Sequence, residues 1–411
     1  MNTLLQIAHV APEMLSADFW LQRIPNPDTP LLEPNQIAGF NERVHKRLNI
    51  PDAFDLPDVL PKAAVEELIN RNGVPDKRYY GGAGQLLDDR YYERLIDNAT
   101  PDSLPVQVPI QFGLVTQRTS ARVFPTFDVA NDEPLELKTD LFQATALDIG
   151  WPVAVVATSR DGFWYFCLTP LYWGWVNRAD IALASRDAVH AYCQPDNWVV
   201  AQSSRGLIGL EAKGGVTPQM GSRLPLIEET SSIYRVRIPV QTSDNRLQIV
   251  DGYIPKQRDE FHRGFVACTQ RNLLTLAFSM LGEGYAWGGS RLGIFGRDCS
   301  RFVKDLYAVT GVVLPRNSGQ QGRVCTPSAE FPADRADSER KAVLVEHGSP
   351  GDLLVLPGHV MVYLGHIEGE PYVIHDVGGN YMRVLVSTLD LYADSPRGSV
   401  LKRMQGAYRV E

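Results

Sequence analysis

The chain has 411 residues, of which 44% are hydrophobic and 21% are charged, and its formal net charge is -8 at pH 7. These proportions are ordinary for a folded globular protein and exclude a disordered or low-complexity chain. Because the net charge is negative and Lys and Arg form no run, the sequence lacks the basic surface that binds phosphate backbones, so we expect no nucleic acid partner.

The length of the chain exceeds what one hydrophobic core usually organises, so we expect several domains. No stretch approaches the roughly 20 uncharged apolar residues of a transmembrane helix, and we expect no membrane span. The N-terminus has no Lys or Arg before Arg23, and His9 and Glu13 interrupt its apolar residues, which is not the pattern of a signal peptide. We therefore expect a cytoplasmic protein, with the periplasm or cell envelope as the alternative if the true start lies upstream.

Residues 1–108 are predicted to be a mostly helical N-terminal segment. Apolar residues recur at helical spacing in 37–48 and 87–96, and residues 61–72 begin with a proline and are followed by Gly73. These features are typical of short helices joined by turns.

The chain then changes to short β-rich runs. Residues 153–157 and 163–169 are separated by turn residues and predict a small all-β domain over 109–190. The same pattern continues over 191–256, which predicts a second all-β domain. Residues 257–411 show a helix first and strands afterwards, the order of an α+β domain, and they contain the residues that can carry chemistry.

Cys299 is the first candidate for catalysis. It follows a Gly-rich loop over 283–297 and comes directly after Asp298, a favourable N-cap residue, so it falls at the first position of a helix predicted to end near Gly311. The unpaired N–H groups and partial positive charge of a helix N-terminus favour a thiolate, so we expect a lowered pKa for Cys299. Its backbone N–H can also stabilise an oxyanion. Cys299 is therefore predicted to be a nucleophile.

Two histidines lie at positions suited to a general base and its orienting partner. His359 begins an apolar strand after a Pro-Gly turn, and His375 ends the apolar strand 372–374. Asp376 is an alternative partner, but neighbouring side chains on a strand point to opposite faces, so only one of the two can face His359, and we favour His375. A zinc site built from Cys299, His359 and His375 is a further alternative. The ligand spacings and the lack of a C-x-x-C pair disfavour it.

Four ordered motifs in this domain resemble one family of enzymes. They are Tyr285-x-Trp287-Gly288-Gly289, Asp298-Cys299-Ser300-x-Phe302-Val303, Pro315-Arg316-Asn317-Ser318-x-Gln320-Gln321 and Gly358-His359-Val360. With a final histidine, they make residues 257–390 resemble the NlpC-type family of bacterial cell-wall cysteine peptidases. The resemblance implies a papain-like domain in which Cys299 is the nucleophile, His359 the general base and His375 the residue that orients it.

The resemblance extends upstream and completes the expected fold class. Two stretches, 122–126 and 174–176, look like a first bacterial SH3-like barrel, and 221–226 with 253–255 look like a second. The N-terminus looks like the stabilising segment of the same multidomain proteins. The expected domains are a helical stabilising segment at 1–108, SH3-like barrels at 109–190 and 191–256, and an α+β, papain-like peptidase domain at 257–411.

The family also implies a substrate. It is expected to be a peptidoglycan stem peptide of the type L-Ala-γ-D-Glu-diamino acid, cut at the γ-D-glutamyl to L-diamino acid bond without a metal or an organic cofactor. The resemblance implies a hydroxyl that stabilises the oxyanion, polar residues that hold the glutamyl carboxylate and the N-terminal amine, and aromatic residues on the first barrel. The implied oxyanion and substrate-binding residues are Tyr285, Trp287, Asp298, Ser300, Ser318, Tyr172 and Trp173.

Two other functions remain open from the sequence. An acyl-enzyme on the same core can pass its acyl group to an amine or an alcohol, which would make the chain a thiol acyltransferase or an amidase. A wall-binding protein that uses only its two SH3-like units is the non-catalytic alternative. The intact Cys299, His359 and His375 argue against it.

Overall fold

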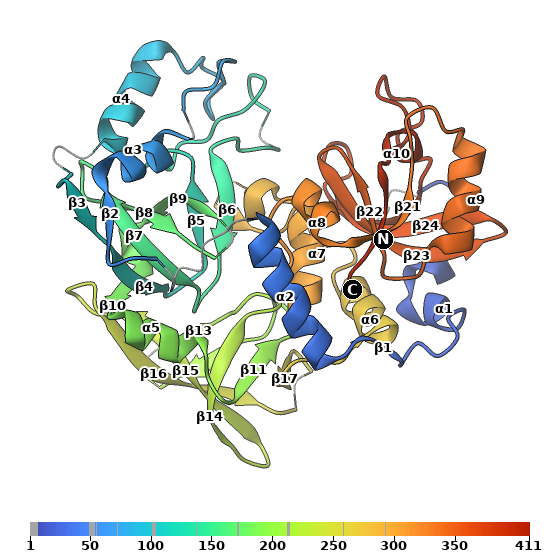
Figure 1. The fold of residues 1–411 in the computed structure, drawn as a ribbon, viewed down its shortest axis with the longest axis horizontal. Helices are drawn as coiled ribbons and strands as arrows, with labels where there is room; N and C mark the ends of the chain where they lie inside the picture. Colours follow the sequence, from blue (N-terminus) through green and yellow to red (C-terminus); the bar gives the residue numbers. More distant parts are fainter. Residues whose placement is uncertain are drawn as a thin grey trace. The chain divides into compact units, whose positions relative to one another are not determined.

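The computed structural model divides the chain into two compact units (Figure 1). The described residues are 7–48, 54, 56–71, 73–100, 104–136, 138–170, 172–211, 214–257, 259–291 and 293–411. Of these, 7–48, 266–285 and 297–411 form the first unit, and the others form the second. The segment predicted over 1–108 thus contributes to both units, and the predicted domain boundaries stay predictions. None of the helices in the described part of the chain combines the length and the apolar character that crossing a membrane requires.

The first unit is built on an antiparallel sheet of six strands, drawn in orange and red in Figure 1. The strands, in sheet order, are β21 (Thr326–Glu330), β26 (Gly406–Arg409), β22 (Leu353–Leu356), β23 (His359–Ile367), β24 (Glu370–Val377) and β25 (Arg383–Thr388). A two-residue turn joins β22 to β23, so that Leu356 pairs with His359, and Gly358 in this turn has a φ of +78°. Glycine takes this conformation without strain, and the turn determines where His359 enters the sheet.

Helices pack on this sheet in two groups. Leu344 of α9 (Asp337–His347) and Leu401 of α10 (Val400–Arg403) share a core cluster with Met361 of β23. The second group consists of α6 (Gln270–Ser279), α7 (Cys299–Ala308) and α8 (Ser318–Val324). Within it, α7 contacts α6, α8 and the two strands β23 and β24. The start of α7 is thereby placed next to the strands that carry the candidate histidines.

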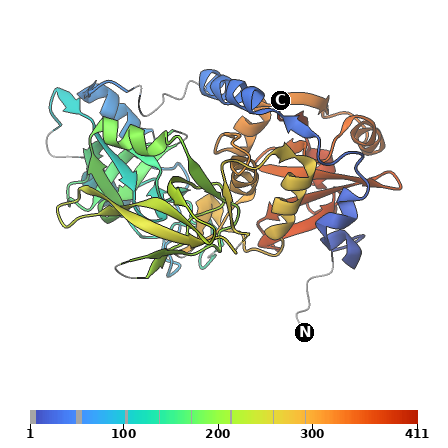
Figure 2. The same cartoon turned by 90° about the horizontal axis from the view of Figure 1, so that it is seen from below.

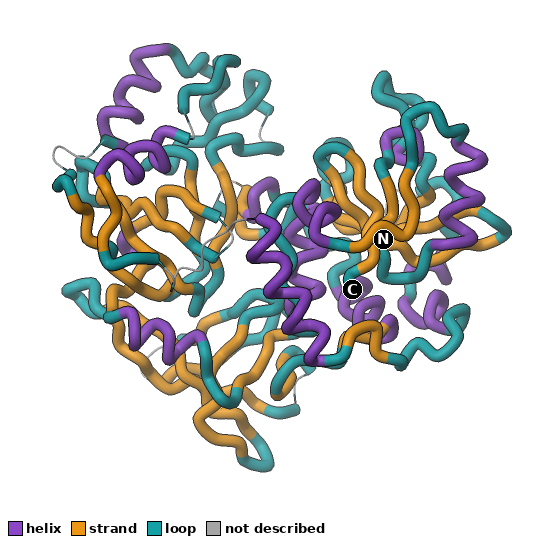
Figure 3. The backbone as a smooth tube through the Cα atoms, viewed as in Figure 1, coloured by secondary structure: helices purple, strands orange, loops and turns teal. Residues whose placement is uncertain are grey.

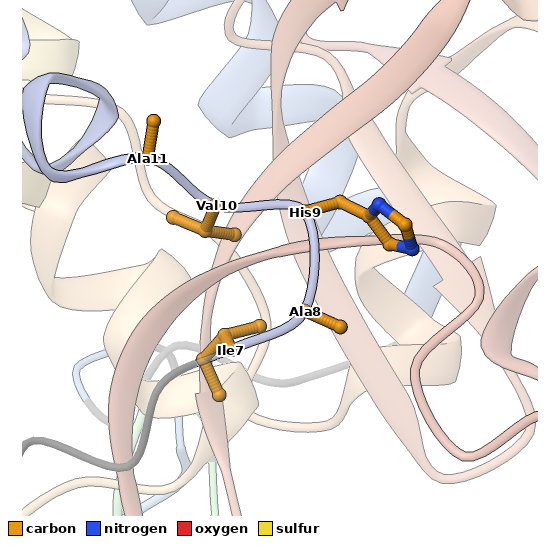
Figure 4. A pocket seen from close by; sticks show the side chains of 5 residues that line it. All are labelled: Ile7, Ala8, His9, Val10 and Ala11. Carbon is orange, nitrogen blue, oxygen red and sulfur yellow. The ribbon is translucent and has the colours of Figure 1, made fainter.

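The N-terminal residues of the first unit pack against its other elements. Helix α1 (Ala17–Leu21) lies beside α6, as Figures 1 and 2 show in blue and gold, and Trp20 is 1% exposed with its ring 5.4 Å from that of Tyr372. The Tyr372 hydroxyl also donates to the carbonyl of His9 at 3.0 Å. His9 belongs to the segment Ile7–Ala11, which lines a pocket (Figure 4). The buried Tyr372 side chain therefore holds the segment Ile7–Ala11 against β24.

Helix α2 (Pro34–Leu48) contacts α8. The side-chain amide of Asn41 donates to the carbonyl of Gly311 at 2.9 Å and accepts from the backbone N–H of Val313 at 2.8 Å. Both bonds satisfy backbone groups in the turn that follows α7. In addition, the short strand β1 (Pro30–Leu32) pairs with β18 (Cys268–Thr269). The N-terminal elements α2 and β1 thus contact the turn after α7 and the strand before α6.

The second unit contains two seven-stranded antiparallel sheets, which account for most of its strands in Figure 3. The first, in sheet order, consists of β10 (Ile181–Ala184), β4 (Gln111–Val115), β7 (Pro152–Thr158), β8 (Trp164–Leu168), β9 (Trp173–Asn177), β5 (Thr119–Arg122) and β6 (Gln143–Leu147). The second consists of β13 (Gly215–Val216), β12 (Ile208–Leu210), β16 (Leu247–Pro255), β15 (Ile233–Gln241), β14 (Arg223–Glu229), β11 (Trp198–Ala201) and β17 (Phe261–Arg263).

Short elements complete the second unit. They are β2 (Val59–Pro61), which pairs with β3 (Gln107–Pro109), and the helices α3 (Lys62–Asn70), α4 (Asp89–Ala99) and α5 (Arg186–Cys193). The predicted fold class is confirmed, because helices and two β-sheet regions precede an α+β domain. The helical N-terminal part is short, because α3 and α4 are its only helices between 59 and 109 among the described residues.

The segment 286–296 belongs to the second unit although it follows α6 in the chain. The Gln143 side chain donates to the carbonyl of Gly288 at 3.2 Å, and Arg118 donates to those of Gly289 and Gly296 at 3.3 and 2.6 Å. A Cβ at Gly288 would stand 2.8 Å from the carbonyl oxygen of Gln143, and Gly288 has a φ of +61°. This close approach requires glycine and explains part of the Gly-rich composition of the loop.

Trp20→Ala is expected to lower the free energy of unfolding of the first unit by about 3 to 5 kcal/mol, because truncating a buried aromatic side chain leaves a cavity. Differential scanning calorimetry would show this as a lower melting temperature. Leu15→Ala is the matched control, since Leu15 is 38% exposed, and its effect should stay within about 0.5 kcal/mol. Equal melting temperatures for the two variants would contradict the packing of α1 on α6.

Candidate active site

Cys299 is the first residue of α7, and it lies against the turn that leads into β23. Its Sγ is 4.0 Å from the carbonyl oxygen of Gly358, and the backbone N–H of Val360 is a second hydrogen-bond partner of the sulfur. The candidate nucleophile therefore contacts the residues on both sides of His359. Cys299 is 6% exposed, so its thiol is shielded from bulk water.

Asp298 forms the N-cap of α7. Its carboxylate accepts hydrogen bonds from the backbone N–H of Arg301 at 2.9 Å and from the hydroxyl of Ser300 at 3.0 Å. The guanidinium of Arg316 donates to both carboxylate oxygens, at 2.6 and 3.1 Å, and to the Ser300 hydroxyl at 2.8 Å. Burial alone would raise the pKa of Asp298, but the charge of Arg316 and these hydrogen bonds lower the pKa below its ordinary value. An ionised carboxylate thus stands next to Cys299.

His359, His375 and Ser387 form a chain of hydrogen bonds across β23, β24 and β25. Nε2 of His359 lies 2.8 Å from Nδ1 of His375, and Nε2 of His375 lies 3.0 Å from Oγ of Ser387. When both Nε2 atoms carry the proton, each ring donates to the next residue, and Nδ1 of His359 keeps a lone pair that can accept a proton. The structure places His375, and not Asp376, against His359.

Burial controls the protonation of the two central residues. It raises the pKa of the Cys299 thiol to about 12, and the Asp298 carboxylate adds to this shift. It also lowers the pKa of His359 to about 4, to which the positive charge of Arg403 contributes. The sequence-based expectation of a lowered pKa for Cys299 is therefore wrong for this structure, because desolvation outweighs the helix terminus. At neutral pH the pair consists of a thiol and a neutral imidazole.

Tyr285 lies near the nucleophile, on the loop before α7. Its ring packs so closely on Gly378 that a Cβ there would stand 3.2 Å from two ring atoms, and its backbone N–H donates to the carbonyl of Met382 at 3.0 Å. Burial, and then the negative charge that Cys299 can carry, raise the pKa of the Tyr285 hydroxyl. The phenol therefore keeps its proton and can donate a hydrogen bond.

Asp376 follows His375 on β24, and its side chain points to the opposite face of the strand. It is fully buried, and neither carboxyl oxygen has a hydrogen-bond partner among the described residues. Burial, and then the Asp298 carboxylate, raise the pKa of Asp376 well above its ordinary value. The protonated form of Asp376 is therefore favoured over what an exposed aspartate would show.

The other predicted substrate-binding residues occupy separate places. Ser300 is buried on α7, and Ser318 is the half-buried first residue of α8. Trp287 is 40% exposed and belongs to the second unit, as do Tyr172 and Trp173, whose rings stack 5.3 Å apart. The roles of all five residues stay predictions.

Two contributors to the site were not assigned a role from the sequence. Arg316 belongs to the Pro-Arg-Asn-Ser motif, which by itself indicates no role for it, and Ser387 lies outside the four motifs. Ser387 lies in an apolar strand, where an isolated buried hydroxyl is a signal of a hydrogen-bond partner. That partner, His375, could be named only once the register between β24 and β25 was known.

The zinc alternative finds no matching geometry. Within the part of the chain that the structure describes, no three His, Cys, Asp or Glu side chains are grouped so that they could hold a metal ion. The nitrogens of His359 and His375 that face each other form a hydrogen bond instead.

Comparison with known proteins identifies two parts of the chain. Residues 282–394 match the NlpC/P60 family, and residues 125–177 match the SH3 domain of the SH3b1 type. Dipeptidyl-peptidase 6 of Lysinibacillus sphaericus is 26% identical over 250 residues, which cover 59% of this chain and 82% of that protein. A γ-D-glutamyl-L-lysine dipeptidyl-peptidase of Bacillus cereus is 28% identical over 154 residues, which cover 38% of this chain and 37% of that protein.

A solved structure is similar over nearly the whole chain. It is an NlpC/P60 endopeptidase from Photobacterium damselae subsp. piscicida, with a TM-score of 0.71 and 18% identity, and the match covers 94% of this chain and 97% of that one. At this identity the likeness is one of fold. The assignment of 191–256 as a second SH3-like barrel stays a prediction. The chain therefore contains an NlpC/P60 domain, of the cysteine peptidase type found in peptidoglycan hydrolases, together with an SH3 domain.

Proposed function

We propose that the chain hydrolyses the γ-D-glutamyl to L-diamino acid bond of peptidoglycan stem peptides. The observation that carries the proposal is the placement of Cys299 in contact with both neighbours of His359, whose imidazole is oriented by His375. The B. cereus relative, a γ-D-glutamyl-L-lysine dipeptidyl-peptidase, supports the choice of bond. The SH3 domain at 125–177 supports the cell wall as the source of the substrate.

In the acylation step, Nδ1 of His359 takes the proton of the Cys299 thiol, and the thiolate attacks the γ-carbonyl carbon of the D-glutamyl residue. A C–S bond forms and the carbonyl oxygen becomes an oxyanion. The backbone N–H of Cys299 and the hydroxyl of Tyr285 are the donors available to it, and each such donor contributes about 10²-fold or more. The C–N bond then breaks, and His359 gives its proton to the leaving amine.

In the deacylation step, water replaces the amine. His359 takes one proton from the water molecule as its oxygen attacks the thioester carbon, and the C–S bond breaks. The proton returns to the sulfur of Cys299. The second proton of the water molecule remains on the new γ-carboxyl group and is lost to solvent as the D-glutamyl product leaves as a carboxylate. Throughout the cycle, His375 and Ser387 hold the imidazole of His359 in one tautomer.

Cys299→Ala is expected to lower the rate of cleavage of L-Ala-γ-D-Glu-diaminopimelate by about 10³-fold or more, because the nucleophile is lost. Mass spectrometry of the products would measure this, with release of L-Ala-γ-D-Glu by the unmodified chain as the expected result. Cys325→Ala is the matched control, since Cys325 is another buried free cysteine of the same unit and should keep the activity. Product formation only in the presence of an added amine or alcohol would contradict hydrolysis and indicate acyl transfer.

The pH dependence of kcat/KM should show an acidic limb near pH 4 instead of the ordinary histidine value of about 6.5. His359 must be neutral to accept the thiol proton, and burial lowers the pKa of His359 to about 4, so activity persists as the pH falls to about 5 and is lost below that. Rates at a series of pH values, with circular dichroism to confirm folding, would measure the limb. A limb near 6.5 would contradict the buried, neutral imidazole.

Ser387→Ala is expected to lower kcat about 10-fold with little change in KM, because His375 loses the hydrogen bond that orients it and the effect reaches the substrate only through His359. Ser387→Thr keeps a hydroxyl at the same position and should restore most of kcat. The melting temperatures of both variants are the control for folding. If Ser387→Thr were as slow as Ser387→Ala, the hydroxyl would have no positioning role.

A further inference from the structure

The first unit has a basic pocket beside the turn between β22 and β23. Its lining includes Arg340, Pro357, Arg397, Lys402, Arg403 and Gln405. Four of these side chains are cationic, and no acidic side chain is among the described residues that line the pocket. A concave surface with one sign of charge attracts ligands of the opposite sign.

The four cationic side chains of the pocket differ in their burial and in their contacts. Arg340 is 1% exposed, and its guanidinium donates to backbone carbonyls, including that of Met404 at 2.8 Å, so it is a buried structural charge. Arg397 and Lys402 are exposed, Arg403 is half-buried, and none of the three forms an ion pair with a described carboxylate. Three cationic side chains are therefore available to a ligand in the pocket.

The pocket lies beside the turn that leads into His359. Pro357 belongs to the turn that leads directly into His359, and the backbone N–H of Gln405 donates to the carbonyl of Val355 at 2.8 Å, so the chain after α10 runs beside the end of β22. The charge of Arg403 also acts on His359, since it contributes to the lowered pKa of that ring. A group bound near His359 can therefore extend into the pocket.

The chemistry of acylation determines which part of the substrate that group is. His359 gives its proton to the leaving amine, so the leaving diamino acid must lie within hydrogen-bonding reach of this imidazole. The side chain of the diamino acid then extends a few ångströms beyond the amine that receives this proton. Lysine carries only an ammonium group at the end of this side chain, whereas diaminopimelate carries a carboxylate beside the amine. Guanidinium groups pair with carboxylates by charge-assisted, often bidentate hydrogen bonds and repel ammonium groups.

We propose that this pocket binds the side-chain carboxylate of the leaving residue and makes the chain selective for an acidic diamino acid over lysine. The inference rests on the proposed function, because it takes the diamino acid as the leaving group. It differs from the specificity named for the B. cereus relative, which is for lysine.

Isothermal titration calorimetry on the full chain with Cys299→Ala separates binding from turnover. Three peptides are compared: L-Ala-γ-D-Glu-meso-diaminopimelate, the same peptide with the side-chain carboxyl amidated, and L-Ala-γ-D-Glu-L-Lys. The first should bind about 10-fold more tightly than the other two, and the preference should weaken with added salt. Equal affinity for the three peptides, or no binding of any of them, would overturn the proposal.

Variants of the pocket test its residues. In the combined variant Arg397→Gln, Lys402→Gln, Arg403→Gln, the affinity ratio between the diaminopimelate and lysine peptides should fall to about one. Lys402→Glu, which changes an exposed side chain, should lower the ratio by itself if the combined variant does not fold. Lys46→Gln removes an exposed charge of the same unit outside the pocket and should keep the ratio. An unchanged affinity ratio in the pocket variants would show that another surface binds the carboxylate.

The same experiment distinguishes a failure of the proposed function from a failure of the pocket assignment. If the chain with Cys299 intact cleaves none of the peptides, the proposed bond is wrong, but the affinity ratio in the Cys299→Ala background still decides the role of the pocket. If the peptides are cleaved without preference and the ratio is one, the bond is right and the pocket assignment is wrong.

Discussion

The position of Cys299, the proposed nucleophile, depends on one buried carboxylate, that of Asp298. It caps α7 through the backbone N–H of Arg301 and binds the guanidinium of Arg316 from the loop before α8. Removing one partner of a buried ion pair typically costs about 3 to 5 kcal/mol, because the other charge is left without compensation. The residue that follows, Cys299, is therefore held by an interaction that cannot be changed on one side alone. This explains why the Asp-Cys-Ser and Pro-Arg-Asn-Ser motifs act as one unit although 16 residues separate Ser300 from Arg316.

The histidine chain depends on a second constraint, the register of three antiparallel strands. His375 pairs with Leu385, and Ser387 lies two residues further along β25 on the same face. A shift of one residue between the strands would turn Asp376 toward His359 and His375 away from it. The turn at Gly358 is the other half of this arrangement, because it fixes where β23 begins relative to β22. The positions of the proposed base and its orienting residue thus depend on sheet geometry, while the position of the proposed nucleophile depends on a helix terminus.

These two origins explain how much of the site the sequence could predict. The start of α7 is a local event, so Asp298 and Cys299 could be placed from their neighbours, and strand alternation was enough to choose between His375 and Asp376. Ser387 and Arg316 contact residues that are 12 and 18 positions away in the chain. The residues adjacent to them in the sequence do not indicate which partner each one contacts. The fold class followed from local patterns for the same reason. The division of the segment 1–108 between two units, and the membership of 286–296 in the second, depend on long-range packing that periodicity does not contain.

The pKa of Cys299 depends on two opposing effects, and the effect of the helix terminus is smaller than that of burial. A helix N-terminus stabilises a negative charge by about 0.3 to 2 kcal/mol, which is at most about 1.5 pKa units. Full burial can shift a pKa by about 3 to 5 units in the opposite direction. In this chain the cap residue is itself an anion, so Asp298 offsets the field of the helix terminus at the place where the thiolate would form, and it raises the pKa of Cys299 further. In the proposed mechanism the helix start therefore contributes geometry and an oxyanion donor, and the thiolate forms as the proton moves to His359 during the attack. In the proposed mechanism the reactivity of the thiol depends on the base and on substrate contacts, so the orientation of the imidazole by His375 and Ser387 matters more than the helix terminus.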